Sequence, residues 1–443
     1  MVEPRVIAIV GGALSGPTAA LKAREIDRTA RIVILEQGAA VRYAVGGLAY
    51  SVSREVADLT AANRRQAQLV ERVHHIEVRT RVRVERIDAE SRQLVLDKER
   101  LRYDRLIFAA GAESIVPDVA GLETARNVFR FRTPADLKGI SAALDRGARR
   151  VVILGGGYFG VEAADGFLRR KCRVTIVERE PRLLSRHSET IAAMAAEALQ
   201  GAGATVLTGA APASVMREGS QVTTVVLADG RRLKADLVVI AAGLRPRTDL
   251  LRAAGARLLP DGTVPIDEHA ATSLPGVFAC GVCVSVPHAP WGRPIWFAQA
   301  AMADKTAQVA GICAAGGDAR LGAVLGTAIL RAGDTTIART GVTSTDAGPD
   351  AAVLHVTAPS HDEFFPGSEP IAIELTYQRS TGRVLGAELA GRAGVDKRID
   401  VFATAVAGGL TVEQLAALDL AYAPPYSAVR DPVNVAGNAA TTR

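Results

Sequence analysis

Cysteine is scarce in this chain, and so are aromatic residues and long apolar runs. Its 443 residues include four cysteines, too few for a disulfide framework in a chain this long. No segment reaches the ~18 uninterrupted apolar residues of a membrane-spanning helix, so we expect no membrane partner. The opening stretch, MVEPRVIAIVGGALSG, runs into glycines and lacks the cleavage pattern of a signal peptide. These absences predict a cytoplasmic protein.

The charged residues indicate neither a nucleic-acid surface nor a metal site. The formal net charge is +6, but no basic helix and no interleaving of aromatic with basic residues accompanies it. We therefore expect no nucleic-acid partner, although the charge would favour anionic cofactors. No metal is expected either, because none of the histidines has metal-ligand spacing to acids or cysteines. These histidines are His74, His75, His187, His269, His288, His355 and His361.

Glycine, by contrast, is placed in a repeated pattern. RVIAIVGGALSGPTAALKARE has the order strand, glycine turn, helix, and RVVILGGGYFGVEAADGFLRR repeats that order about 145 residues later. Each stretch is followed by an apolar strand that closes on an acid, ARIVILE at Glu36 and CRVTIVE at Glu178. This duplication predicts two βαβ dinucleotide-binding units in one chain.

The second unit carries a complete G-x-G-x-x-G in Gly155, Gly157 and Gly160. The first glycine permits a tight turn, the second lets a pyrophosphate approach the backbone, and the third lets helix and strand pack closely. The helix beyond them offers free N–H groups to phosphates. Glu178 is spaced to accept hydrogen bonds from both ribose hydroxyls, which favours NADH because a 2′-phosphate would be repelled. Arg179 next to it keeps NADPH as an alternative.

The first unit is looser, with Gly11, Gly12 and Gly16 around Ala13, which replaces the central glycine. Glu36 is in register for a ribose. The simplest interpretation is FAD in the first unit and NADH in the second, with hydride passing between them. The alternative is that one unit is structural only.

Two further strands end in Ala-Ala-Gly, RYDRLIFAAGAE at Gly111 and KADLVVIAAGLRPRTD at Gly243. Each is typical of the strand that returns from a small β excursion and closes a dinucleotide domain. DEHAATSLPGVFACGV, with Gly281, would bring the chain back to the first domain, and all three glycines are predicted to bind cofactors. The expected fold is α/β, with two Rossmann-like domains and a C-terminal α+β domain. The expected boundaries are 1–115 and 246–325 for FAD, 116–245 for NAD(P)H, and 326–443 for the third domain.

The order of these motifs resembles the pyridine nucleotide–disulfide oxidoreductases, in the branch of coenzyme A-disulfide reductases and NADH oxidases. The most specific matches are GGGYFGVE, ADKTAQVAG, TGRVLGAELAG, GVDKRIDVFATA, DLAYAPPYS and DPVN. The resemblance covers nearly the whole chain. It implies FAD and NAD domains, a dimerisation domain whose tail reaches the partner's flavin site, and therefore a homodimer. Coenzyme A or a derivative is a further partner that it suggests.

The resemblance fails at the reactive cysteine. The family motif beside the flavin reads Ser-Tyr-Ala-Asn-Cys-Gly-Leu-Pro-Tyr, whereas residues 42–50 read Arg-Tyr-Ala-Val-Gly-Gly-Leu-Ala-Tyr. Gly46 therefore stands at the cysteine position. The thiolate is the nucleophile in disulfide exchange, and glycine cannot replace it. Disulfide reduction of the family type is excluded at this position.

Other family positions depart as well. Leu14 stands where NADH oxidases carry a histidine, and Val282 replaces an aspartate that binds the flavin's ribityl chain. Losing that carboxylate should weaken FAD binding by ~1.5–3 kcal/mol. Residues 364–367 read Phe-Phe-Pro-Gly where coenzyme A-disulfide reductases have Tyr-Tyr-Pro-Gly. Of these side chains only the tail tyrosine, Tyr422, is kept.

Three hypotheses follow. In the first, reduced flavin gives its electrons to a small-molecule acceptor other than a disulfide, such as oxygen or a quinone-like compound. Its candidate catalytic residues are Arg42, Tyr43, Gly46, Tyr50, Tyr422 and Tyr426, with the arginine holding an anionic substrate and the tyrosines supplying protons or lining the space. In the second, the chain is a turnover-impaired NADH- or coenzyme A-binding paralogue with a regulatory or structural role. In the third, Cys280 and Cys283 form a relocated Cys-x-x-Cys thiol centre.

Overall fold

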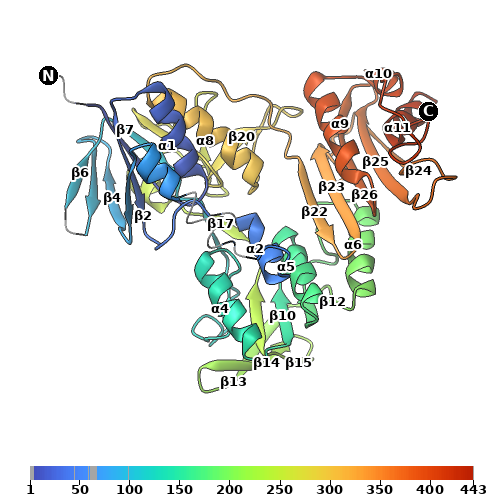
Figure 1. Cartoon of the computed structure of the whole chain (residues 1–443), viewed down its shortest axis with the longest axis horizontal. Helices are drawn as coiled ribbons and strands as arrows, with labels where there is room; N and C mark the ends of the chain where they lie inside the picture. The colour runs from blue at the N-terminus through green and yellow to red at the C-terminus, as the bar shows by residue number, and fades with distance from the viewer. Residues whose placement is uncertain (1–3, 44, 58, 60–66, 98, 443) are drawn as a thin grey trace.

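The computed structural model describes residues 4–43, 45–57, 59, 67–97 and 99–442. It arranges them in three units built around three five-stranded sheets (Figure 1). The described helices are α1 (Ser15–Ile26), α2 (Leu48–Val52), α4 (Pro134–Asp145), α5 (Tyr158–Arg169), α6 (Glu189–Gly201), α7 (Asp249–Ala253), α8 (Ala300–Ala314), α9 (Val395–Gly408), α10 (Val412–Ala416) and α11 (Pro432–Thr441).

The first unit is a parallel sheet in the order β19-β7-β1-β2-β3. These strands are β19 (Val277–Ala279), β7 (Arg105–Phe108), β1 (Val6–Val10), β2 (Arg31–Glu36) and β3 (Glu77–Thr80). Central strands such as β1 are continuous apolar runs because both faces of a parallel sheet are buried. Helices α1 and α8 pack against each other beside this sheet (Figure 1). Residues of the N-terminal segment and of the range 250–324 thus build one core, although more than 130 residues separate them in the sequence.

The second unit repeats this design in the order β12-β11-β10-β16-β9. Its parallel strands are β12 (Thr205–Leu207), β11 (Arg173–Val177), β10 (Arg150–Leu154), β16 (Leu237–Ile240) and β9 (Val128–Phe129). Helix α4 begins with a capping box between Thr133 and Asp136 and has proline in its first turn. The sequence therefore fixes where this helix starts.

Small antiparallel sheets lie before the last central strand of each unit. In the first they are β4 (Val84–Asp88), β5 (Gln93–Leu96) and β6 (Arg100–Arg102); in the second, β13 (Pro212–Glu218), β14 (Gln221–Leu227) and β15 (Arg232–Lys234). After the central strands, β8 (Ala112–Ser114) pairs with β17 (Leu244–Pro246). This pairing joins the two segments in which the polypeptide passes between the first and the second unit. Three short strands, β18 (Val264–Pro265), β20 (Val284–Pro287) and β21 (Pro294–Ile295), form a further sheet.

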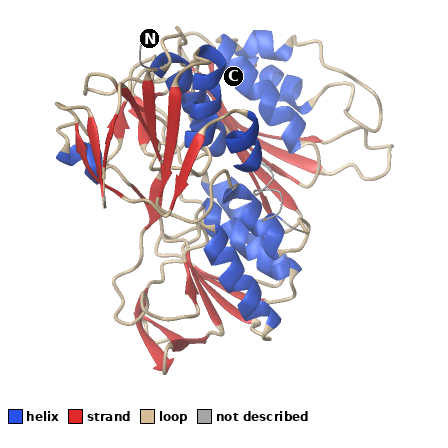
Figure 2. Cartoon of the chain, turned by 60° about the vertical axis from the view of Figure 1, so that its left-hand side comes forward, coloured by secondary structure: helices blue, strands red, loops and turns tan. Residues whose placement is uncertain are grey.

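The third unit is an antiparallel sheet in the order β22-β23-β26-β25-β24. Its strands are β22 (Ala328–Ala332), β23 (Thr335–Gly341), β26 (Val384–Gly391), β25 (Pro370–Gln378) and β24 (Ala351–Pro359). One face packs against α9 and α11, and the other packs against α6 of the second unit. The sheets and the helices beside them can be followed in Figure 2. This α/β fold with a C-terminal α+β unit is the predicted one.

Candidate active site

The second glycine loop has the geometry that its spacing predicts. Gly155 ends β10 with φ of 110°, and a Cβ there would collide with the carbonyl oxygen of Ala241. A Cβ on Gly160 would likewise collide with the carbonyl oxygen of Gly155. Gly157 is exposed, and a Cβ on it would meet nothing within 4 Å. Gly155 and Gly160 are therefore needed for the turn and its packing, while Gly157 faces open space that a ligand can approach.

Glu178 is held at the mouth of this loop. Its carboxylate accepts hydrogen bonds from the backbone N–H groups of Gly156, at 2.5 Å, and Glu180, at 2.8 Å. Each carboxylate oxygen has lone pairs left for a further donor. Arg179 is exposed and forms an ion pair with Glu180 at 3.4 Å. The acid is thus fixed by the backbone beside the loop, as a ribose-binding residue requires.

The first glycine loop repeats this arrangement. Glu36 accepts hydrogen bonds from the N–H groups of Gly12, at 2.7 Å, and Gly38, at 2.5 Å. Gly11 has φ of 109°, and a Cβ on Gly16 would collide with the Gly11 carbonyl oxygen. The first and second units therefore present the same geometry of strand, glycine loop and acid.

Gly111, Gly243 and Gly281 lie where the backbone turns near these loops, with φ of 70°, 120° and 84°. The N–H of Gly281 donates to Thr306 Oγ1 at 2.9 Å. The next residue, Val282, accepts a hydrogen bond on its carbonyl oxygen from the indole N–H of Trp296 at 2.9 Å. The backbone at this position is therefore tied to β21 and α8, and the valine side chain brings no hydrogen-bonding group.

Arg42 and Gly46 lie on the segment that leaves the first unit. Arg42 has φ of 51°, and its backbone N–H donates to the carbonyl oxygen of Gly12 at 2.7 Å, which ties it to the first glycine loop. Gly46 lies in the short 3₁₀ turn Val45–Gly47, directly before α2. It is exposed, and a Cβ on it would meet nothing within 4 Å. A small molecule could therefore occupy the space beside Gly46.

Tyr43 is influenced by the charge of Arg132, a partly buried residue that the sequence did not reveal as part of a site. Burial and the nearby Glu36 raise the pKa of Tyr43, and Arg132 opposes that rise. The Arg132 guanidinium lies 5.4 Å from the ring centroid of Phe159, in the second glycine loop. Its Nη1 is buried and makes no hydrogen bond to any described residue. Arg132 thus offers a spare donor near both loops, but its sequence context signals only the start of α4.

Tyr50 belongs to a different cluster, in which Arg331 of β22 is central. The Arg331 guanidinium lies 5.3 Å from the Tyr50 ring centroid and pairs with Glu55, at 2.6 Å, and with buried Asp165 of α5, at 2.9 Å. Hydrogen bonds from Arg331 lower the pKa of Glu55 to about 2. This cluster joins the segment after Gly46 to the second and third units.

Glu162 of α5 is a carboxyl that titrates near neutral pH. Burial, and then the charge of Asp165, raise its pKa to about 7. It is also the charged neighbour that most raises the pKa of Tyr50. A group with this pKa can hold or release a proton at physiological pH. Sequence reasoning missed it because its pKa depends on burial.

Tyr422 and Tyr426 belong to the third unit, and their neighbours among the described residues differ from those of Tyr43 and Tyr50. The Tyr422 hydroxyl donates to Asp362 Oδ2 at 2.6 Å. Buried Arg398 holds the same segment through the carbonyl oxygen of Tyr426, at 3.2 Å, and that of Ser360, at 2.8 Å. The side chain of Tyr426 is 72% exposed.

The first residue of α5 is anchored to the third unit. The Tyr158 hydroxyl lies 2.6 Å from His187 Nε2, and His187 Nδ1 lies 2.7 Å from Glu388 Oε1. His187 therefore lies between the tyrosine hydroxyl, on its Nε2 side, and the carboxylate, on its Nδ1 side. His187 and Glu388 are fully buried, and burial raises the pKa of Tyr158. This series of side-chain contacts from Tyr158 through His187 to Glu388 couples the second glycine loop to β26.

Comparison with known proteins decides the family. The profile of the pyridine nucleotide-disulphide oxidoreductases matches residues 5–305. The profile of that family's dimerisation domain matches residues 331–432. The chain belongs to this family. It is therefore a flavin-dependent NAD(P)H oxidoreductase by family, and its family binds FAD and NAD(P)H.

Individual relatives of this oxidoreductase differ in their acceptors. The NAD(P)H sulfur oxidoreductase (CoA-dependent) of Pyrococcus abyssi is 30% identical over 446 residues, covering 97% of each chain. The NADH oxidase of Methanocaldococcus jannaschii is 26% identical over 438 residues, again covering 97% of each chain. The structure of a NAD-dependent persulfide reductase from A. fulgidus has a TM-score of 0.94 at 30% identity, covering 99% of this chain and 83% of that one.

The described residues fit the two nucleotides of the family. Both loops have cradles that a Cβ would fill, and each has a carboxylate fixed beside it. The buried Nη1 of Arg132 is a donor suited to an anionic group such as a pyrophosphate. No group of three or more histidine, cysteine, aspartate or glutamate residues in the described ranges could hold a metal ion. No helix within those ranges is long and apolar enough to span a membrane.

All four cysteines of this oxidoreductase are free thiols. Cys280 and Cys283 are fully buried. Burial raises the pKa of Cys280 well above its usual value and that of Cys283 to about 11. Burial also raises the pKa values of Cys172 and Cys313. Reactive cysteines have lowered pKa values, so this structure disfavours the thiol-centre hypothesis.

Proposed function

We propose that this protein passes electrons from NADH through FAD to an acceptor other than a disulfide, such as oxygen or a small organic molecule. The observation that carries the proposal is Gly46. The resemblance to the family motif puts the reactive cysteine at this position, and here it is an exposed glycine with open space around it. The raised pKa values of the remaining cysteines add support.

The proposed roles of the side chains follow from their positions. Glu178 binds the ribose of NADH at the second loop, while Glu36 and Arg132 hold FAD at the first. FAD supplies the two-electron exchange with nicotinamide, which no side chain can perform. Arg42 and Tyr43 stand between the first glycine loop and the space at Gly46, where they orient an anionic or polar acceptor. Tyr50 of α2 and Glu162 of α5 are the proposed proton-holding groups.

A second candidate, reduction of coenzyme A disulfides or persulfides, is favoured by the relatives. Two proteins at 30% identity are a CoA-dependent sulfur oxidoreductase and a persulfide reductase. Coenzyme A can remain a ligand even if thiol chemistry at residue 46 is lost. Such activity would need Cys280 and Cys283, whose burial opposes it.

Acceptor profiling of the FAD-loaded enzyme tests the proposal. NADH consumption is compared with oxygen, a quinone, coenzyme A disulfide and polysulfide as acceptors. We expect turnover with oxygen or the quinone and none with the sulfur compounds. Gly46→Cys should introduce disulfide reduction, and Cys280→Ser should leave the wild-type profile unchanged. Wild-type turnover of coenzyme A disulfide that Cys280→Ser abolishes would overturn the proposal.

A further inference from the structure

A row of charged residues crosses the third sheet on the face toward α6. In register, Arg339 of β23 lies opposite Glu388 of β26, Glu388 opposite Glu374 of β25, and Glu374 opposite His355 of β24. The residues of the two glutamates are 0% and 2% exposed. Like charges directly opposite each other in a sheet are destabilising, so each carboxylate needs its own compensation.

The two carboxylates are compensated unequally. Glu388 has His187 Nδ1 at 2.7 Å and accepts a hydrogen bond from the Ser188 N–H at 3.0 Å. Among the described residues, Glu374 has one such neighbour, His355 Nδ1 at 3.4 Å. Both oxygens of Glu374 are buried, and neither accepts a hydrogen bond from a described residue. A buried carboxylate without hydrogen bonds is costly, so this site lacks a donor or a cation.

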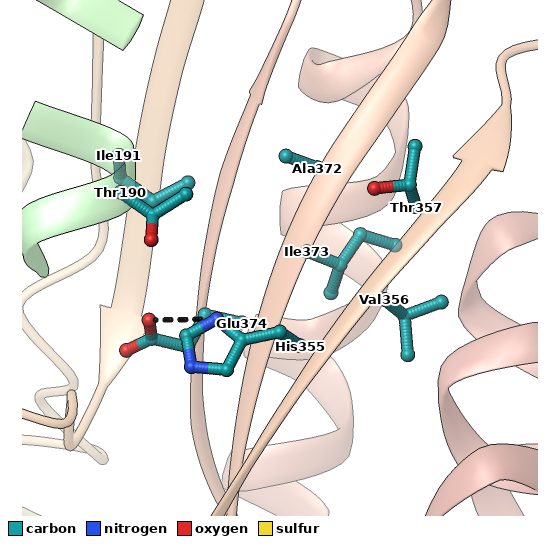
Figure 3. Close-up of a pocket in the computed structure, with 8 residues that line it drawn as sticks. All are labelled: Thr190, Ile191, His355, Val356, Thr357, Ala372, Ile373 and Glu374. Atoms are coloured by element: carbon teal, nitrogen blue, oxygen red, sulfur yellow. Dashed lines mark ion pairs between the residues drawn. The ribbon is translucent and has the colours of Figure 1, made fainter. Parts of the chain in front are cut away.

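A cavity of about 130 Å³ adjoins this carboxylate. In Figure 3 the Glu374 carboxylate, the His355 ring and the Thr190 hydroxyl border the same space, with Thr357 further along it. The volume holds several waters or one small organic ion and is too small for a nucleotide. The His355 side chain is 61% exposed, so the cavity lies next to solvent.

We propose that this cavity binds a small monovalent cation, with Glu374 as its counter-ion. Ammonium, an alkali ion or a guanidinium-sized head would each supply the missing positive charge. The Thr190 hydroxyl, at the start of α6, adds an oxygen from the second unit. A bound cation would therefore fasten the second unit to the third. The proposal is independent of the electron acceptor.

The test uses the FAD-loaded enzyme exchanged into choline chloride, whose quaternary ammonium is bulkier than the small ions tested and carries no N–H to donate. Ammonium, potassium, sodium or guanidinium chloride then replaces choline chloride at constant ionic strength, and thermal unfolding is followed in each salt. Guanidinium replaces only a low millimolar part of the choline. We expect at least one small cation to raise Tm saturably, by about 2 °C. A larger response to ammonium than to potassium would identify N–H donation as part of the recognition.

Two variants and a control make the result specific. Glu374→Gln should abolish the cation response without melting below the wild type in choline, because it removes a buried carboxylate that accepts no hydrogen bond from a described residue. His355→Gln should enlarge the response, because it removes the imidazole whose Nδ1 lies 3.4 Å from the Glu374 carboxylate. Glu363→Gln, at an exposed position in the same unit, should respond like the wild type. The proposal would be overturned if the small cations raised the Tm of Glu374→Gln as much as that of the wild type. It would also be overturned if the wild type had the same Tm in choline and in every small cation.

Discussion

At the scale of single residues, Glu178 is the group that should select the nicotinamide nucleotide. Glu178→Ala removes the carboxylate that would accept from the ribose, and charge-assisted hydrogen bonds are worth roughly 1.5–3 kcal/mol. We expect kcat/KM for NADH to fall ~10–100-fold, with a smaller loss or a gain for NADPH. Steady-state kinetics with both nucleotides measure this. Glu180→Ala is the control, and an equal loss for both nucleotides in Glu178→Ala would contradict the assignment.

Glu162 should make stability depend on pH. Its pKa rises from the ordinary 4.5 in the unfolded chain to about 7 in the folded protein. The folded state therefore binds the proton more tightly, and ionisation costs stability as pH rises from about 4.5 through 7. In urea unfolding, Glu162→Gln should match the wild type at pH 4 and gain on the order of 3 kcal/mol at pH 8.

The control for this experiment is Glu197→Gln, at an exposed position of α6. It should change the free energy of unfolding little at either pH. A pH-independent effect of Glu162→Gln would show that its carboxyl is not the titrating group.

At the scale of elements, the chain from Tyr158 through His187 to Glu388 ties α5 to β26. Tyr158→Phe should cost about 1 kcal/mol of unfolding free energy. His187→Ala should cost roughly 3–5 kcal/mol, because it leaves Glu388 buried with its imidazole partner removed. The double variant should cost less than the sum, since the tyrosine's partner is already lost.

Urea unfolding of the single and double variants measures this coupling. Tyr103→Phe is the matched control, because the Tyr103 hydroxyl is buried and has no hydrogen-bond partner among the described residues. That variant should be neutral or stabilising. Additive effects of the Tyr158 and His187 substitutions would mean that the two elements are not coupled through these side chains.

The elements that the sequence predicted are those with short-range signals. The glycine loops follow from spacing within one strand–turn–helix unit, and the acids at Glu36 and Glu178 follow from the next strand. The cluster at Arg331 could not be foreseen, because Glu55 lies 276 residues away in the sequence. The same holds for Arg132 and Glu388, whose partners are set by packing between units. The roles assigned to Arg42 and the tyrosines remain predictions.

At the scale of the whole molecule, the exposed tail of the third unit indicates a second copy of the chain. Phe364, Tyr426 and Val429 are 76%, 72% and 74% exposed, and Tyr422 and Arg398 hold these segments together. Apolar groups exposed together mark interaction sites. Sedimentation of the wild type should give a mass of twice the 46.4 kDa chain. The Tyr426→Asp variant should shift the measured mass toward that of a single chain. A fully active wild-type monomer would contradict the dimer.

The measurement that tests the central claim most directly is an anaerobic titration of the FAD-loaded protein with NADH, followed by flavin absorbance. If electrons pass through flavin without a thiol centre, about one equivalent of NADH should bleach the flavin, since FAD accepts two electrons. Consumption of about two equivalents would reveal a second two-electron acceptor and contradict the account. Cys280→Ser would then identify whether that acceptor is the buried cysteine pair.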